Sequence, residues 1–191
     1  MDVHTQSFLN NHPCFNKGAS VNWGRVHLPV APNCNIQCNF CNRMYDCANE
    51  NRPGVTQKVY TPDEAVAYLE KLFKDRQDIS VIGIAGPGDP MCDADKTLPT
   101  FEKCRARFPH LMLCLSTNGL ALPEHVDDIV RIGVSHVTVT VNAVTPSVGG
   151  KVYAWVRYNG KTYTGEEGAA ILLARQDEGI RKLKEAGMIV K

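Results

Sequence analysis

Three cysteines close together carry the strongest chemical signal in this 191-residue sequence. Cys34, Cys38 and Cys41 have a C-x3-C-x2-C spacing, so their thiolates can converge on one metal centre without closing a long loop. Zinc sites usually add a second ligand pair, and no C-x2-C follows here. Ferredoxin-type runs supply a fourth cysteine and close their cluster. Three thiolates therefore favour a 4Fe–4S cluster with one open iron, and a structural zinc loop is the alternative interpretation.

The composition is that of an ordinary globular protein. Apolar residues make up 43% of the chain, charged residues 21%, and the net charge is +1. The balanced charge gives no reason to expect a nucleic acid partner. The sequence has no apolar run of about 18 residues, and its polar start is unlike a signal peptide, so we expect a cytoplasmic protein without a membrane span. In that compartment, eight cysteines indicate metal binding rather than disulfides.

The pattern of elements predicts an α/β fold. Residues 1–20 form an irregular arm that carries Cys14, and residues 21–191 alternate between strands and helices. Alternation of this kind predicts a parallel sheet with helical crossovers, and we expect the polar ends of its strands to share one mouth. The chain stops within a fifth strand at residues 188–190. The four preceding strands are expected at residues 25–30, 79–85, 111–116 and 136–141.

Local signals mark several boundaries. Thr61, Pro62 and Glu64 predict a capping box at a helix start, and Thr164 with Glu167 predicts a second one. Residues 156–163 predict a small hairpin around an Asn-Gly turn. The polar segment 42–54 has no periodicity, which is typical of a long functional loop.

The thiol spacing, with Phe40 one residue before the last cysteine, resembles the radical SAM superfamily. In that superfamily the open iron binds S-adenosylmethionine, and one electron from the cluster generates a 5′-deoxyadenosyl radical. The resemblance implies that residues 21–191 form a partial (βα)6 TIM-type barrel of the radical SAM kind. Further stretches are similar to the NifB family of nitrogenase cofactor biosynthesis, at residues 12–15, 25–32, 41–47, 52–55, 85–90, 116–120 and 136–140.

The resemblance to the NifB family implies a specific reaction. That family fuses two 4Fe–4S clusters and inserts a carbide carbon from the methyl group of S-adenosylmethionine, forming the eight-iron precursor of the nitrogenase cofactor. Its partners would be an iron–sulfur cluster donor and nitrogenase-cofactor assembly proteins. The alternative is a cluster-binding scaffold, or an inactive fragment without catalysis. The family continues with more barrel and another cysteine pair, so we expect a missing C-terminal part and no eight-iron product from residues 1–191.

The resemblance also implies roles for individual residues. Cys34, Cys38 and Cys41 would bind the radical-generating cluster, and Glu50 and Arg52 would line the active site. The first precursor cluster would be held by His27, Cys47 and Cys114, and the second by Cys14. S-adenosylmethionine would contact Phe40, Gly86, Gly88, Asp89, Asn118, Thr140 and Asn142. For Asn118, Thr140 and Asn142, an equal alternative is that the side chains only form local hydrogen bonds at turns and strand ends. Cys92 and Cys104 are expected to be ordinary thiols.

Strand alternation makes one of these pairings testable. His27 lies on the first strand and Cys114 on the third, each a few residues before its strand ends. Alternate strands of a barrel contribute side chains to the same interior layer. We therefore expect both to face the interior, no more than about 8 Å apart if they hold one cluster. The alternative is a hydrogen-bonded core histidine and an inert buried thiol.

Overall fold

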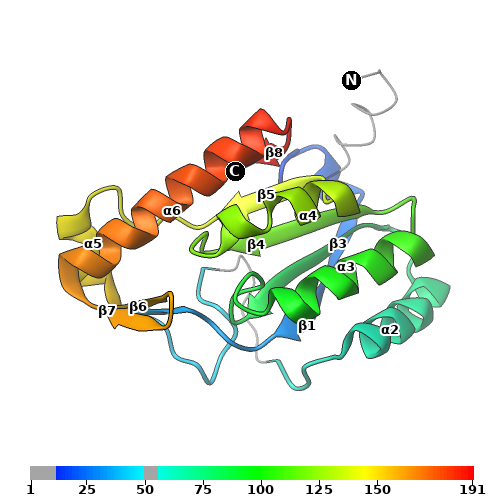
Figure 1. Cartoon of the computed structure of the whole chain (residues 1–191). Helices are drawn as coiled ribbons and strands as arrows, with labels where there is room; N and C mark the ends of the chain where they lie inside the picture. The colour runs from blue at the N-terminus through cyan, green and yellow to red at the C-terminus, as the bar shows by residue number, and fades with distance from the viewer. Residues whose placement is uncertain (1–11, 50–55) are drawn as a thin grey trace.

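A parallel sheet organises the molecule in this computed structural model, which describes residues 12–49 and 56–191 (Figure 1). Within that part of the chain, five parallel strands lie in the order β1-β3-β4-β5-β8. This arrangement confirms the predicted α/β fold, and each strand lies within a few residues of its predicted position. The strands are β1 (Gly24–Ala31), β3 (Ile79–Pro87), β4 (Met112–Thr117), β5 (His136–Val139) and β8 (Ile189–Val190).

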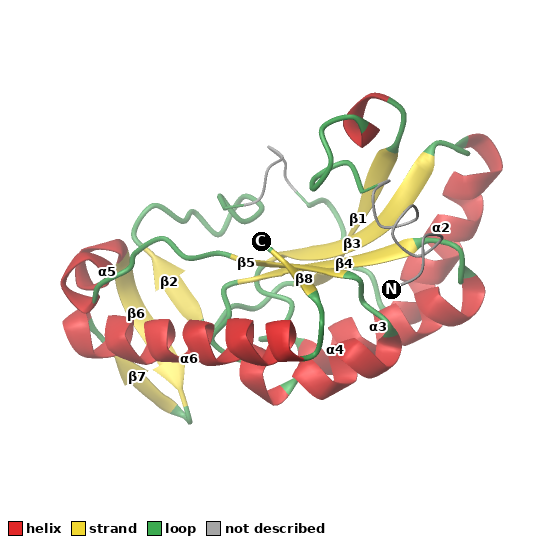
Figure 2. Ribbon diagram, turned by 90° about the horizontal axis from the view of Figure 1, so that it is seen from above, coloured by secondary structure: helices red, strands yellow, loops and turns green. Residues whose placement is uncertain are grey.

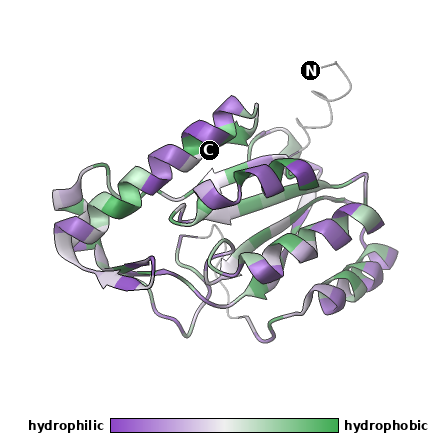
Figure 3. Ribbon diagram, viewed as in Figure 1, coloured by the Kyte–Doolittle hydropathy of each residue, from purple (hydrophilic) through white to green (hydrophobic). Residues whose placement is uncertain are grey.

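Helices cover one face of this sheet and leave the other to loops (Figure 2). The covering helices are α2 (Pro62–Asp75), α3 (Ala94–Arg107), α4 (Val126–Ile132) and α6 (Gly165–Glu185). Alternate strand residues such as Leu28, Ile82 and Leu115 pack under the helices in the main hydrophobic core. In Figure 3 green, apolar segments of the strands alternate with paler ones. The other residues of the strands, at alternate positions, are therefore free to build a site.

A second, antiparallel sheet adjoins the first. It pairs β2 (Ile36–Cys38) with β6 (Tyr153–Tyr158), and β6 with β7 (Lys161–Tyr163). The β6–β7 hairpin and its Asn-Gly turn were predicted, and Asn159 and Gly160 adopt the positive φ values of 48° and 72° that such a turn needs. Neither β2 nor helix α5 (Pro146–Val152) was predicted. A strand of three residues is too short to show periodicity.

The two predicted capping boxes have different outcomes. Thr61 and Glu64 form the reciprocal capping box at the start of α2, as predicted. At the start of α6, Thr164 makes no side-chain capping hydrogen bond, so the second prediction is wrong. Gly165 follows with φ of 59°, outside the right-handed helical region, and this changes the entry of the chain into the helix.

The remaining short elements complete the described chain. A 3-10 helix, η1 (Ala19–Val21), precedes β1, and another, η2 (Leu122–Glu124), precedes α4. Across residues 12–49 and 56–191, no helix is both long and apolar enough to cross a membrane.

Candidate active site at the carboxyl ends of the strands

The carboxyl ends of the strands open onto one cavity of about 190 Å³, as predicted for a shared mouth. Strand β3 contributes Gly88 and Asp89 just after its end, β4 contributes Thr117 and Asn118, and Thr140 follows β5. The thiol-bearing loop forms the opposite wall, with four cysteines: Cys34, Cys38, Cys41 and Cys47. The cavity thus joins soft metal ligands to polar strand ends.

Backbone pairing fixes the thiol loop. Cys38 ends β2 and pairs with Tyr153 of β6, so the second sheet holds the middle thiol in place. The Cys41 N–H donates to the Cys38 carbonyl at 3.0 Å. The Gln37 side chain donates to the carbonyls of both cysteines at 3.1 Å, and Arg43 donates to the Ile36 carbonyl at 2.6 Å. The unpredicted strand is therefore what positions the predicted ligands.

Burial raises the pKa of two thiols of the loop, Cys34 and Cys38. It is the largest cause raising the pKa of Cys34 to about 11, with Asp89 adding to the shift. Burial also raises the pKa of Cys38 to about 12, and Cys34, Cys47 and Cys41 add to it. Iron binds thiolates, so metal loading at these two residues must release protons.

The donor set fits an iron–sulfur cluster better than a single ion. In residues 12–49 and 56–191, no three His, Cys, Asp or Glu side chains converge closely enough to hold one metal ion. A four-iron cluster separates its ligands more widely, because each thiolate binds a different iron. Three soft thiolates around one cavity match that requirement.

The Asp89 side chain connects the ends of two neighbouring strands, β3 and β4, at the cavity. Its carboxylate is 3% exposed. It accepts hydrogen bonds from the Asn118 N–H at 2.6 Å and the Thr117 hydroxyl at 3.0 Å. It also accepts from the backbones of Met91 and Cys92 at 3.0 and 3.2 Å. Burial raises the pKa of Asp89, and these donors oppose that shift. The carboxylate thus faces protein donors and holds the end of β4 to the turn after β3.

Close backbone packing explains Gly88. Its N–H donates to the Ala31 carbonyl at 2.7 Å, and a Cβ at this position would fall 2.1 Å from the Asn33 carbonyl oxygen. Any side chain would therefore push apart the end of β3 and the start of the thiol loop. Asp93 fixes the same segment, accepting from the Asn33 backbone and amide at 2.8 Å each.

Asn118 turns toward the thiol loop. Its amide nitrogen donates to Asn35 Oδ1 at 2.7 Å and lies 3.6 Å from Cys34 Sγ, while its Oδ1 accepts from the Leu120 N–H at 2.9 Å. Asn142 lies nearby, its N–H donating to the Tyr153 hydroxyl at 3.4 Å. Phe40, which is half exposed, lies on the cavity rim.

Gln176 is a site residue that the sequence analysis missed. It lies on α6, is 2% exposed, and donates to the carbonyls of Asn118 at 2.8 Å and Thr140 at 3.0 Å. It therefore joins the ends of β4 and β5. A signal was available, because Gln176 falls on the apolar face of its helix, four residues from both Leu172 and Ile180.

A row of residues crosses the face of the main sheet that the helices do not cover. His27, Gly83, Cys114 and His136 are register partners on β1, β3, β4 and β5. The His27 ring lies over Gly83, about 3.5 Å from where a Cβ would stand. His27 and Cys114 are thus register partners of the same residue, Gly83, on its two sides. Their predicted separation and their role as ligands stay predictions.

The described part of the N-terminal arm lies against this row. The rings of His12 and Phe15 lie 4.3 and 4.5 Å from the His136 ring, measured between centroids. Arg25, two residues before His27 on β1, donates to the Cys14 sulfur. Cys14 thus adjoins the His27 face of the sheet, whereas Cys47 lines the thiol cavity. Glu50 and Arg52 lie outside the described residues.

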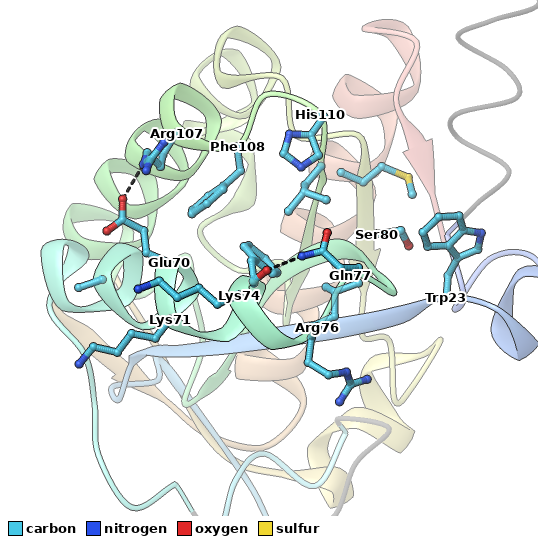
Figure 4. Close-up of a pocket in the computed structure, with 15 residues that line it drawn as sticks. Trp23, Glu70, Lys71, Lys74, Arg76, Gln77, Ser80, Arg107, Phe108 and His110 are labelled. Carbon is cyan, nitrogen blue, oxygen red and sulfur yellow. Dashed lines mark hydrogen bonds and ion pairs between the residues drawn. The ribbon is translucent and has the colours of Figure 1, made fainter.

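A larger hollow of about 980 Å³ lies at the amino ends of the strands (Figure 4). Trp23, Phe73 and Phe108 give it an apolar lining. Two polar contacts lie within it: Arg107 pairs with Glu70 at 2.5 Å, and Gln77 donates to the Phe73 carbonyl at 2.7 Å. No cysteine lines it. The smaller cavity at the carboxyl ends is therefore the candidate site.

The fold and the thiol cavity match a known class. The family model of the radical SAM superfamily matches residues 28–191, and the chain belongs to this superfamily. Two solved structures share the TIM-type fold. Methylornithine synthase (PylB) has a TM-score of 0.54 at 17% identity, over 88% of this chain and 43% of that one. The enzyme anSMEcpe with bound AdoMet has a TM-score of 0.55 at 12% identity, over 87% of this chain and 42% of that one.

More similar sequences narrow the class to particular relatives. The FeMo cofactor biosynthesis protein NifB of Chlorobaculum tepidum is 48% identical over 183 residues, which is 96% of this chain and 43% of that protein. The NifB protein of Sinorhizobium fredii is 48% identical over all 191 residues and 39% of its own length. That of Klebsiella pneumoniae is 47% identical over 180 residues, 94% of this chain and 38% of that protein. The chain spans about two fifths of the length of these relatives.

Proposed function

We propose that this chain is the radical SAM part of a nitrogenase cofactor biosynthesis protein. The proposed reaction fuses two 4Fe–4S substrate clusters and inserts a carbide carbon from the methyl group of S-adenosylmethionine, giving an eight-iron precursor. The observation that supports this proposal most strongly is that Cys34, Cys38 and Cys41 line one cavity together with three strand ends, in a chain 48% identical to NifB proteins. The proposed setting is cytoplasmic, with a cluster donor and cofactor assembly proteins as partners.

The thiol loop would hold the resident cluster. Cys34, Cys38 and Cys41 would bind three of its irons and leave the fourth for S-adenosylmethionine. When bound, the cluster and S-adenosylmethionine supply a 5′-deoxyadenosyl radical. The chain's own contribution is to fix the three thiols through β2 and to limit water, with Cys38 only 6% exposed. Phe40 on the rim would shield the open side.

The strand ends would bind S-adenosylmethionine. Gly88 and Asp89 line the cavity just after β3, and the resemblance assigns them, with Gly86, to the amino acid part of the ligand. Thr140 lines the same cavity and would contact the nucleoside. Asn142, two residues later, is proposed for the same role from the resemblance alone. Gln176 would keep the ends of β4 and β5 at the spacing that the ligand needs.

The uncovered face of the sheet would hold a substrate cluster. His27 and Cys114 project from one register row and are the proposed ligands. The resemblance gives Cys47 as their companion, but Cys47 lines the thiol cavity. Cys14, which accepts a hydrogen bond from Arg25 on the His27 face of β1, stays the proposed ligand of the second substrate cluster. Glu50 and Arg52 remain proposed active-site residues from the resemblance alone.

Anaerobic reconstitution tests the proposal against a cluster-binding scaffold. The reconstituted chain is given reductant and S-adenosylmethionine, and iron content and 5′-deoxyadenosine are measured together. Iron bound with 5′-deoxyadenosine formed supports the enzyme. Iron bound without cleavage supports the scaffold, and no iron bound at the thiol loop contradicts both. Because this chain spans about two fifths of the length of these relatives, the test measures S-adenosylmethionine cleavage and not the eight-iron product.

A further inference from the structure

We infer that Asn118 is a positioning residue for the resident cluster, and that its side-chain amide raises the cluster's reduction potential through a hydrogen bond to Cys34. This inference rests on the proposed function, because it requires a cluster at the thiol loop. Its starting observation is the distance of 3.6 Å between Asn118 Nδ2 and Cys34 Sγ, which is within hydrogen-bond range for sulfur.

The neighbours of the Asn118 side chain determine its orientation. Its Oδ1 accepts from the backbone N–H of Leu120, so the opposite, donating side of the amide must face the thiol loop. One N–H goes to Asn35 Oδ1 at 2.7 Å, and the second is left for the Cys34 sulfur. A nucleoside would therefore find both donors of this amide already engaged.

Two buried groups hold the Asn118 backbone from opposite sides. Asp89 accepts its N–H at 2.6 Å, and Gln176 donates to its carbonyl at 2.8 Å. Both groups are at most 3% exposed, and Asn118 itself is 8% exposed. Such anchoring leaves the amide little freedom to turn away from Cys34. A donor fixed before the cluster binds costs no further ordering when it does.

The electrostatic consequence has a definite sign. A cluster gains negative charge on reduction, and part of that charge resides on its cysteine sulfurs. An N–H aimed at a sulfur stabilises the reduced state more than the oxidised state, so it raises the potential. The effect is stronger in a buried site, because water screens the interaction less. Asn118 would thereby make the resident cluster easier to reduce.

Redox titration of the reconstituted chain, followed by EPR, tests this inference. Asn118→Leu keeps a similar volume and removes the donor, so the potential should shift to a lower value. Asn118→Ala removes the donor without adding a charge, and it should lower the potential too; it serves if the leucine variant does not fold. Asn35→Ala is the matched control, because it removes the other partner of the amide and should leave the potential unchanged.

The outcomes separate this inference from the proposed function. A cluster with an unchanged potential in both Asn118 variants would overturn the inference alone. So would weaker binding of S-adenosylmethionine with no change in potential, which would indicate a nucleoside-binding role. A wild-type chain that takes up no iron at the thiol loop would overturn the inference and the proposed function together.

Discussion

The two hollows at opposite ends of the sheet differ in how their polar groups are used. The amino-end hollow of about 980 Å³ is the larger, but its charged groups lie at the exposed surface, as the Arg107–Glu70 pair does. The carboxyl-end cavity of about 190 Å³ joins four thiols to buried carboxylate and amide groups from separate strands. Convergence of buried polar groups, rather than volume, therefore identifies the functional end of this sheet.

The largest expected effect is on metal binding at the carboxyl-end cavity. Replacing Cys34, Cys38 and Cys41 together by alanine should abolish cluster uptake at the loop, because Cys47 alone would remain of the four cysteines that line the cavity. The measurement is iron and sulfide content after anaerobic reconstitution. Cys104→Ala is the matched control: this thiol is buried in the hydrophobic core, and its loss should leave iron content unchanged. Equal iron in the triple variant and the wild type would break the comparison.

The next effect concerns the buried carboxylate that joins two strand ends. Four protein donors bond the Asp89 carboxylate. Asp89→Asn replaces one of its two acceptor oxygens with a donating NH2 group, which faces these donors unfavourably. We expect the free energy of unfolding of the metal-free protein to fall by about 2–4 kcal/mol. Asp63→Asn, at an exposed ion pair with Lys103, should cost less than about 1 kcal/mol. Similar costs in denaturant titrations of the two variants would contradict a special role for Asp89.

The buried histidines on the helix-free face of the sheet should make the stability of the metal-free protein depend on pH. Burial is the largest cause lowering the pKa of His12 to about 3, with His136 and Arg25 adding to the shift, and burial lowers that of His136 to about 4. Both folded-state values lie below the unfolded value of about 6.5, so the unfolded chain binds more protons at low pH. Metal-free stability should therefore be fully present above about pH 6.5 and decline toward pH 4.

A variant assigns this pH dependence. His136→Phe keeps a ring beside Phe15 and removes one titrating group. The slope of unfolding free energy against pH should therefore decrease by the contribution of about one bound proton. Denaturant titrations between pH 4 and 8 provide the measurement. An unchanged slope would show that His136 is not the group responsible.

The smallest effect is expected in the amino-end hollow. A double-mutant cycle on Arg107→Gln and Glu70→Gln should give a coupling of about 0.5 kcal/mol, because both side chains are largely exposed. Neither change should alter the affinity of the reconstituted protein for S-adenosylmethionine. A large loss of that affinity would indicate that S-adenosylmethionine binds in the amino-end hollow, and would contradict the assignment of the site to the carboxyl-end cavity.

The sequence predicted what local patterns determine. Alternation located the strands of the main sheet, and the thiol spacing located the cavity, because both signals lie in contiguous residues. Strand β2 was missed, since three residues show no periodicity and its pairing with β6 joins segments more than 110 residues apart. Gln176 was missed for a similar reason: its partners, Asn118 and Thr140, come from distant strands.

Chain packing also changed the interpretation of residues that the sequence did identify. Gly88 was expected to contact S-adenosylmethionine, and the structure shows that its missing side chain leaves room for the Asn33 backbone. Asp89 was expected to contact S-adenosylmethionine, and its carboxylate is engaged by four protein donors. A pattern of residue types can locate a site, but the partner of each side chain depends on contacts between distant segments.

The central claim is that Cys34, Cys38 and Cys41 hold one cluster whose open iron binds S-adenosylmethionine. The most direct test is EPR of the reduced, reconstituted protein with and without S-adenosylmethionine, in a Cys14→Ala, Cys114→Ala background that removes proposed substrate-cluster ligands. We predict a single reduced 4Fe–4S signal whose shape changes when S-adenosylmethionine is added. A tightly bound stoichiometric zinc without iron, or a cluster signal that S-adenosylmethionine leaves unchanged, would contradict the claim.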